Sequence, residues 1–362
     1  LVEFTNQFVK RINHRLKDIP ILANQIDHGK IKLIRYQSEN LVEPLVNNIL
    51  TTGLSGTTCV LTITNKEALQ VAGLLLKNRM PVKLIQSNDG FSLFNLFEVR
   101  FFLNQLNLMR DSFVIGDDIW ERAKYKLSEV FRNSTRLDLV NNIIENFETT
   151  NQKKKYKSDL EVFLHESKLE DFFSEGGETI FVSTVHKSKG KEFDNVFLLL
   201  ENFEPSTDEK KRQLYVAMTR AKRNLTIHLN GTYLDSIIAG NVEIVDDNET
   251  YLTPTELVMH LTHKDVNLGY FEFVQHRMEN LVAGDLLVKV DKGYANINDE
   301  LVLKFSKKFI ETIVEQEKRG FLLDEVKVGF LVYWKNEDSD KEVKIILPEL
   351  YFKKIETTVV HV

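Results

Sequence analysis

At 362 residues the chain is longer than one typical domain, so we expect two or three compact units. A hydrophobic content of 43% with 28% charged residues is ordinary for a soluble globular protein with real cores. The single cysteine, Cys59, excludes an intramolecular disulfide and a cysteine-rich zinc site, and the net charge of −6 excludes a general polyanion binder.

No stretch of the sequence reaches the roughly 18 apolar residues that span a bilayer. No signal-peptide pattern opens the chain either, so we expect a cytoplasmic protein without a membrane partner. His260 and His263 have a metal-like spacing, but no matching cluster accompanies them, and no metal site is predicted.

Residues 1–108 alternate between strand-like and helix-like segments. The predicted elements are strands at 31–36, 58–63 and 82–85 and helices near 3–17, 39–51, 65–78 and 93–108. Alternation at this spacing indicates βαβ units and a largely parallel sheet.

The hydrophobic period changes between 109 and 177, where apolar residues recur with helical spacing. We predict a helical insertion there, between two strands of one sheet. The α/β pattern resumes at 178 and lasts to 240, and the acidic, turn-rich segment 240–254 indicates a domain boundary. Residues 255–362 predict antiparallel strands with one helix near 306–319. The fold class is therefore α/β with a helical insertion, followed by a small mostly-β domain that resembles a barrel.

The most informative segment is a strand-like run, 180–185, that ends in a basic turn, residues 186–192. Polar groups at the end of a buried strand are where open α/β sheets bind ligands. Basic residues gather in this turn and in the helix that follows it: Lys187, Lys189, Lys191, Lys210, Lys211, Arg212, Arg220, Lys222 and Arg223. A local basic surface on an acidic protein indicates a defined track for phosphates.

Two sequences in this region are longer than chance patterns. Residues 184–193 are Thr-Val-His-Lys-Ser-Lys-Gly-Lys-Glu-Phe, and residues 214–221 are Leu-Tyr-Val-Ala-Met-Thr-Arg-Ala. In order and spacing they resemble motifs V and VI of the UvrD/Rep-like superfamily 1 DNA helicases. The resemblance covers roughly 1–240 and implies a RecA-like domain 2A, formed by 1–108 and 178–240. It also implies that the insertion 109–177 is a reduced form of the larger family domain 2B.

The resemblance implies a nucleotide site with three residues. Arg220 corresponds to the arginine finger that reaches the γ-phosphate of ATP held by another domain, a task that suits a permanently charged planar donor. Gly190 lets the backbone approach a phosphate closely. Glu192 would be repelled by phosphate, and the family places its counterpart near the ribose. For Arg220 a solvated or sheet-capping arginine is the alternative.

The same resemblance implies contacts with single-stranded DNA. Thr184 and His186 offer short donors at a strand end, beside Lys187, and the turn residues Thr64 and Asn65 are further candidates. The alternatives are a structural His186, a solvated Lys187 and a helix N-cap at Thr64 and Asn65.

The chain has no G-x-x-x-x-G-K-[ST] phosphate loop and starts with Leu1, so we expect the C-terminal part of a longer protein. The resemblance implies ATP with Mg²⁺, whose ligands would lie in an N-terminal RecA-like domain of the same protein, and DNA partners with a single strand and a duplex junction. We expect a helicase or translocase that cannot hydrolyse ATP as this fragment alone. The alternative is a degenerate helicase half that acts as a DNA- or protein-binding adaptor.

Overall fold

The computed structural model describes residues 1–14, 22, 29–85, 91–106, 113–167, 169–172, 179–237, 239–240, 242–335 and 341–354. The chain divides into two compact units. Unit 1 comprises Leu1–Ser87 and Ser174–Leu257, and unit 2 comprises Asn88–Phe173 and Val258–Val362. Each unit is therefore built from two separate stretches of sequence. The described residues of the predicted insertion and those from 258 onward share unit 2, while the predicted domain boundaries stay a prediction.

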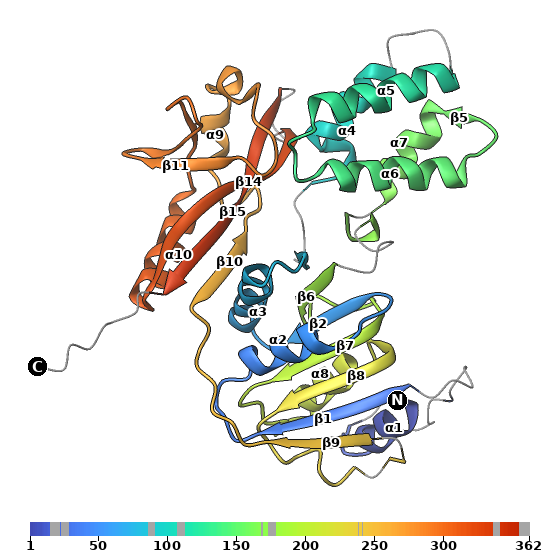
Figure 1. The fold of residues 1–362 in the computed structure, drawn as a ribbon, viewed down its shortest axis with the longest axis vertical. Coiled ribbons are helices and arrows are strands. Elements are labelled where there is room, and N and C mark those ends of the chain that lie inside the picture. The colour runs from blue at the N-terminus through green and yellow to red at the C-terminus, as the bar shows by residue number, and fades with distance from the viewer. Residues whose placement is uncertain are drawn as a thin grey trace, which may run out of the picture. The chain divides into compact units, whose positions relative to one another are not determined.

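Unit 1 is centred on a seven-stranded sheet with the order β3-β6-β2-β7-β8-β1-β9 (Figure 1). Every strand pair described in it is parallel. The strands are β1 (Lys30–Tyr36), β2 (Thr58–Thr62), β3 (Val82–Leu84), β6 (Ile180–Thr184), β7 (Phe193–Leu200), β8 (Ala221–Leu229) and β9 (Val242–Asp247). The predicted α/β class with a parallel sheet is confirmed. Strand β9 was not predicted, because it lies in the acidic segment 240–254.

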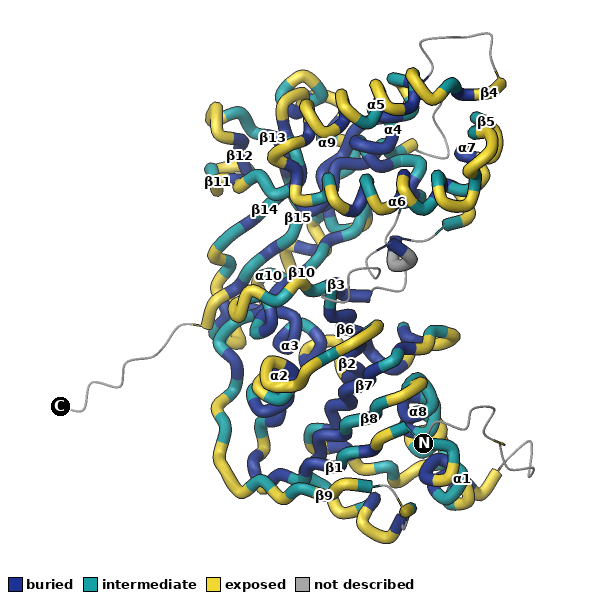
Figure 2. The backbone as a smooth tube through the Cα atoms, turned by 45° about the vertical axis from the view of Figure 1, so that its right-hand side comes forward, coloured by how far each residue is buried: buried dark blue, intermediate teal, exposed yellow. Residues whose placement is uncertain are grey.

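Helices cover both faces of this sheet. They are α1 (Val2–Val9), α2 (Val42–Thr51), α3 (Asn65–Lys77) and α8 (Asp208–Met218). Figure 2 shows the buried strands with α2 and α3 on one side and with α1 and α8 on the other. The apolar stripes of α2 and α3 share one core with alternate strand residues such as Val60, Val182 and Leu199. Because successive strand residues face opposite sides, the remaining strand residues are available to the other layer.

The first part of unit 2 is helical. It contains η1 (Leu93–Asn95), α4 (Phe97–Leu106), α5 (Asp117–Val130), α6 (Leu137–Thr150), α7 (Lys157–Glu166) and η2 (Leu169–Phe172), with the short strands β4 (Val114–Ile115) and β5 (Lys155–Tyr156). Trp120 is fully buried and packs edge-on against Phe102, with ring centroids 5.0 Å apart, and against Phe147 at 5.8 Å. The predicted helical insertion is confirmed as a helical region with an aromatic core.

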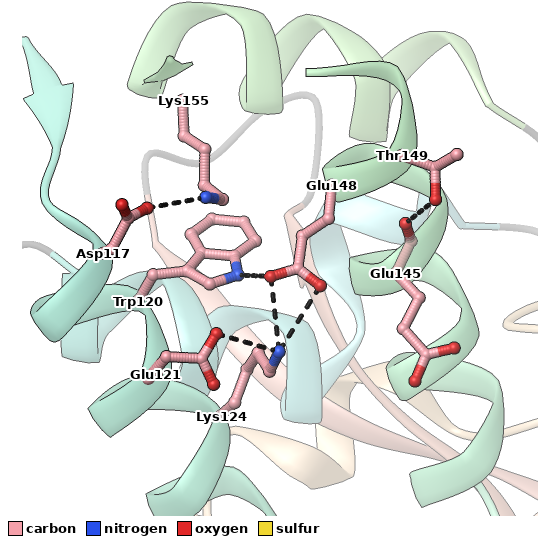
Figure 3. A network of polar contacts seen from close by, with 8 residues as sticks. All are labelled: Asp117, Trp120, Glu121, Lys124, Glu145, Glu148, Thr149 and Lys155. Carbon is pink, nitrogen blue, oxygen red and sulfur yellow. Dashed lines mark hydrogen bonds and ion pairs between the residues drawn. The ribbon is translucent and has the colours of Figure 1, made fainter. Parts of the chain in front are cut away.

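A polar network fixes α5 against α6 around this tryptophan (Figure 3). The indole nitrogen of Trp120 donates to Glu148, which also accepts from Lys124 at 3.3 Å. On the other side of the ring, Lys155 donates to Asp117 at 2.9 Å and lies 5.5 Å from the ring centroid. The buried indole N–H is therefore satisfied, as a buried tryptophan requires.

The second part of unit 2 is mostly β, as predicted. A six-stranded sheet has the order β10-β15-β14-β11-β12-β13. Its strands are β10 (Glu256–His260), β11 (Leu286–Val290), β12 (Gly293–Ala295), β13 (Leu301–Leu303), β14 (Phe321–Lys335) and β15 (Glu342–Lys354). The short α9 (Leu268–Phe271), η3 (Gln275–Met278) and the longer α10 (Lys307–Lys318) accompany it. Within the described ranges, every helix of the chain is too short or too polar to cross a lipid bilayer.

Candidate functional site

Two neighbouring strands of unit 1, β2 and β6, end side by side. Thr62 is the register partner of Thr184, and both are the last residues of their strands. Helix α3 starts just after β2, and the basic turn starts just after β6. The parallel sheet thus brings Asn65 and Lys187 together, and the Lys187 Nζ donates to the Asn65 Oδ1 at 3.1 Å. Carboxyl ends of parallel strands are the usual ligand-binding edge of such sheets.

The predicted DNA-contacting residues differ in their exposure at this edge. Thr184 is buried, Lys187 is half-buried and His186 is exposed. Burial lowers the pKa of Lys187 from its ordinary value. Because the partner of Lys187 is a neutral amide, the positive charge of its ammonium group is not cancelled by that contact.

Thr64 has a structural role in the fold. Its side chain accepts a hydrogen bond from the Glu67 backbone N–H at 3.2 Å, and the Glu67 carboxylate accepts from the Thr64 N–H at 3.0 Å. This reciprocal pair is a capping box, which satisfies the first N–H groups of α3. The N-cap alternative for Thr64 is therefore present in the structure, and a contact of Thr64 with DNA stays a prediction.

The segment 185–192 connects β6 to β7, although β2 lies between these strands in the sheet. It is a crossover that runs from the carboxyl end of one parallel strand to the amino end of another. Its own hydrogen bonds keep it compact: Lys187 and Ser188 donate to the Thr184 carbonyl at 3.0 and 3.1 Å, and Lys191 donates to the Ser188 carbonyl at 3.0 Å. Such crossovers normally need a dozen or more residues. With only eight residues, this crossover directly links the edge where the strands end to the edge where they begin.

Gly190 lies in the exposed part of the crossover and has φ +84°, a conformation that favours glycine. A Cβ atom built on Gly190 would meet no heavy atom within 4 Å. The space above Gly190 is therefore open, as a close approach to a phosphate requires. Glu192, two residues later, is exposed.

Arg220 lies between α8 and β8, at the amino end of β7. Its side chain is half-buried and donates three hydrogen bonds: from Nε to the Val216 carbonyl at 2.9 Å, from Nη1 to the Lys191 carbonyl at 3.1 Å and from Nη2 to the Thr219 Oγ1 at 3.1 Å. Its own carbonyl accepts from the Phe193 N–H at 2.9 Å. The arginine of the second motif thus lies against the basic turn of the first.

The eight candidate residues therefore form two groups at opposite ends of one crossover. Thr64, Asn65, Thr184, His186 and Lys187 are at or next to the carboxyl ends of β2 and β6, and Gly190, Glu192 and Arg220 are near the amino end of β7. Sequence reasoning missed three contributors, the Thr219 hydroxyl and the carbonyls of Val216 and Lys191. The hydroxyl was visible beside Arg220 in the motif, whereas no sequence pattern indicates a main-chain acceptor.

Among the described residues, no three His, Cys, Asp or Glu side chains come together in a way that could hold a metal ion. The charged groups of the crossover are instead mostly cationic.

Part of the chain matches a known protein family. Residues 117–232 match the family model of the UvrD-like helicase C-terminal domain, a range that includes the basic turn and Arg220. No curated protein matches the chain. A crystal structure of the C-terminal domain of a possible DNA helicase from Lactobacillus plantarum WCFS1 is similar at 14% identity, over 67% of this chain and 94% of that chain, with a TM-score of 0.32. At this TM-score the likeness carries no argument about the site.

Proposed function

We propose that this chain, which carries a UvrD-like helicase C-terminal domain, is the C-terminal portion of an ATP-dependent DNA helicase or translocase. Its phosphate loop would lie in an N-terminal RecA-like domain of the same protein. The observation that carries the proposal is the position of Arg220, half-buried at the end of α8 and in contact with the basic turn beside Gly190. A guanidinium held in this way is suited to stabilise charge that develops on a transferred phosphoryl group.

The residues near the amino end of β7 fit a nucleotide bound mainly by another domain. Gly190 has open space above it and a backbone that only glycine adopts without strain, so a phosphate could approach closely. Arg220 would face the γ-phosphate, and the exposed Glu192 would accept a hydrogen bond from a ribose hydroxyl. ATP with Mg²⁺ supplies the phosphoryl group when bound, and the Mg²⁺ ligands would come from the N-terminal domain.

The residues at the carboxyl ends of β2 and β6 would contact single-stranded DNA next to a duplex junction. His186 is exposed and Lys187 is half-buried there, and the Lys187 ammonium group donates a hydrogen bond to the Asn65 side chain. Contacts of this kind go mainly to the phosphate backbone and depend little on base sequence. The proposed strand-binding group is therefore Thr184, His186, Lys187, Thr64 and Asn65.

The test is DNA-stimulated ATP hydrolysis by the polypeptide that includes the phosphate loop. Arg220→Ala should reduce turnover on the order of 10³-fold, as arginine fingers do in related phosphoryl transfer. Arg122→Ala is the matched control, because it removes an exposed guanidinium from α5 in the other unit, and its turnover should equal that of the wild type.

Two outcomes would contradict the proposal. Unchanged turnover in Arg220→Ala would show that Arg220 is not an arginine finger. DNA or protein binding by a wild-type polypeptide that never hydrolyses ATP would favour the adaptor instead. The purified 362-residue chain should show no turnover in either case.

A further inference from the structure

We propose that Thr219 is a positioning residue that holds the Arg220 guanidinium in its working orientation between α8 and the basic turn. This inference rests on the proposed function, because it concerns the residue that would reach the phosphate. Thr219 is the C-cap residue of α8 and is half-buried. It is adjacent to Arg220 in the chain, yet its hydroxyl bonds to the far end of the arginine side chain.

The direction of the Thr219 hydroxyl is fixed by its two partners. The hydroxyl donates to the Val216 carbonyl at 2.9 Å, which uses its one hydrogen. Its oxygen then accepts from the Arg220 Nη2 at 3.1 Å. The Val216 carbonyl also accepts from the Arg220 Nε at 2.9 Å, and a carbonyl oxygen with two lone pairs can hold both bonds. The Thr219 hydroxyl and the Val216 carbonyl therefore accept the hydrogen bonds of one side of the guanidinium and are also bonded to each other.

The third bond of the guanidinium, from Nη1 to the Lys191 carbonyl, goes to a different element. Lys191 follows Gly190 in the crossover. Two residues after Lys191, the Phe193 backbone N–H donates to the Arg220 carbonyl. The guanidinium is therefore fixed at two acceptors on α8 and at one on the basic turn. Three such points define the plane of a rigid planar group.

This arrangement decides which edge of the arginine can face a phosphate. Nε carries a single N–H, and that N–H donates to Val216, so the fork formed by Nε and Nη2 is closed. A bidentate contact with a phosphate must then use the Nη1 and Nη2 end, where the bond to the Lys191 carbonyl can be exchanged. Thr219 keeps the other side of the guanidinium on α8 during that exchange. A pre-oriented donor stabilises a transition state without paying for its own reorganisation.

The primary experiment compares Thr219→Val with Thr219→Ser in the polypeptide that includes the phosphate loop. Valine keeps the β-branched shape and removes the hydroxyl, whereas serine keeps the hydroxyl. Thr219→Val should lower kcat for DNA-stimulated ATP hydrolysis about tenfold, the size expected for one lost hydrogen bond to a charged group, and should leave KM for ATP nearly unchanged. Thr219→Ser should restore wild-type kcat. The thermal unfolding midpoint should be the same for all three proteins.

A second measurement uses the purified 362-residue chain and needs no nucleotide. Hydrogen exchange of peptides that cover 188–193 should be faster in Thr219→Val than in the wild type, because a loosened guanidinium holds the Lys191 carbonyl less firmly. Exchange over 225–229, inside β8, should not change. Thr219→Ser should match the wild type in both segments.

The outcomes separate this inference from the proposed function. If Arg220→Ala abolishes turnover and Thr219→Val leaves both kcat and exchange unchanged, the positioning role is wrong and the arginine finger stands. If Arg220→Ala has no effect on turnover, the proposed function fails, whatever Thr219→Val does to exchange. A loss of kcat in Thr219→Val that serine does not restore, or that accompanies a lower unfolding midpoint, would identify a structural role and overturn the inference.

Discussion

The two units place their charged groups in different ways. In unit 1, Lys187 and Arg220 lie half-buried at strand ends and bond to neutral partners, an amide, a hydroxyl and main-chain carbonyls. In unit 2, Glu98 is 1% exposed and Lys344 is 7% exposed. The difference teaches that the two charges of unit 1 stay partly accessible at strand ends, whereas Glu98 and Lys344 in unit 2 are enclosed by their own partners.

The buried charges of unit 2 are held by their own neighbours. Ser134 donates to Glu98 at 2.8 Å, and burial raises the pKa of Glu98. Lys344 donates to the Met278 carbonyl at 2.7 Å and lies 4.1 Å from the ring centroid of Phe97. Burial lowers the pKa of Lys344 to about 8, against smaller opposite effects of Glu279 and Glu98. The contact of Lys344 with Phe97 joins β15 to α4, and the other two join β15 to η3 and α4 to the loop before α6, so these groups have a role in stability.

The largest expected effect on stability is a loss of packing in unit 2, the unit whose charges are enclosed. Trp120→Ala removes a fully buried indole from between Phe102 and Phe147 and leaves Glu148 without one of its donors. The free energy of unfolding of this region should fall by about 3–5 kcal/mol. Denaturant unfolding of the purified chain measures the change in free energy. Hydrogen exchange over 117–150 shows whether that change is located in this region.

Tyr125 provides the matched control for Trp120, because it lies on the same helix and is 70% exposed. Tyr125→Ala should change the free energy of unfolding by no more than about 0.5 kcal/mol. A Trp120→Ala protein as stable as Tyr125→Ala would show that the aromatic core does not hold α5 against α6.

A smaller effect should appear in the pH dependence of stability. The pKa of Lys344 is about 8 in the folded protein and 10.5 as its ordinary value. Between these values the unfolded chain binds more protons, so the contribution of Lys344 to stability rises with pH from about 8 to 10.5. The full rise is about 3 kcal/mol, at about 1.4 kcal/mol for each unit of pKa difference. The wild type should therefore gain stability relative to Lys344→Met over this window, in chemical unfolding at several pH values.

The reverse pH trend would contradict the assignment of Lys344 as a destabilised buried cation. Lys327→Met serves as the control, because Lys327 is one-third exposed and paired with Glu325 on the same strand. Lys327→Met shows how much of any change comes from the loss of a lysine side chain at an accessible position.

The sequence predicted the parallel sheet because its buried strands are short apolar runs between helices with a clear period. β6 and β7 are of this kind, whereas β8 begins with exposed basic residues and is buried only in its second half. Strand β9 escaped prediction because it is an edge strand: Ile244 is 48% exposed, and Asp246 and Asp247 suggest a turn. An edge strand needs no apolar pattern, since only one side of it pairs.

The candidate site was predictable only in part. The strand order that brings Asn65 to Lys187 follows from parallel pairing of β2 with β6, but which strands pair cannot be deduced from local patterns. Whether Thr64 caps α3 was open until the geometry of Glu67 was known. The orientation of Arg220 depends on the Lys191 carbonyl, and every residue type has a carbonyl. Contacts between side chains and main chain therefore limit what a motif alone can establish.

The smallest effect concerns a buried pair in unit 1 that does not belong to the site. His228 is fully buried, and its Nδ1 lies 2.9 Å from the Tyr36 hydroxyl, with the two rings stacked at 5.7 Å. Tyr36→Phe leaves that nitrogen without its hydroxyl partner and should reduce the free energy of unfolding by about 1–3 kcal/mol. Denaturant unfolding measures this cost, and Tyr125→Phe, at an exposed position, should show none.

The protonation of His228 makes this pair a test of the opening comparison. Burial is the main cause that lowers the pKa of His228 to about 3, with a smaller contribution from Lys32. The unfolded chain therefore binds more protons between pH 3 and the ordinary value of 6.5, and stability from this group falls as the pH drops through that window. His228→Phe should remove this part of the acid sensitivity and leave DNA-stimulated turnover unchanged. A loss of turnover at constant stability would instead place a deeply buried residue of the sheet in the function, against the proposal that residues at the strand ends carry it.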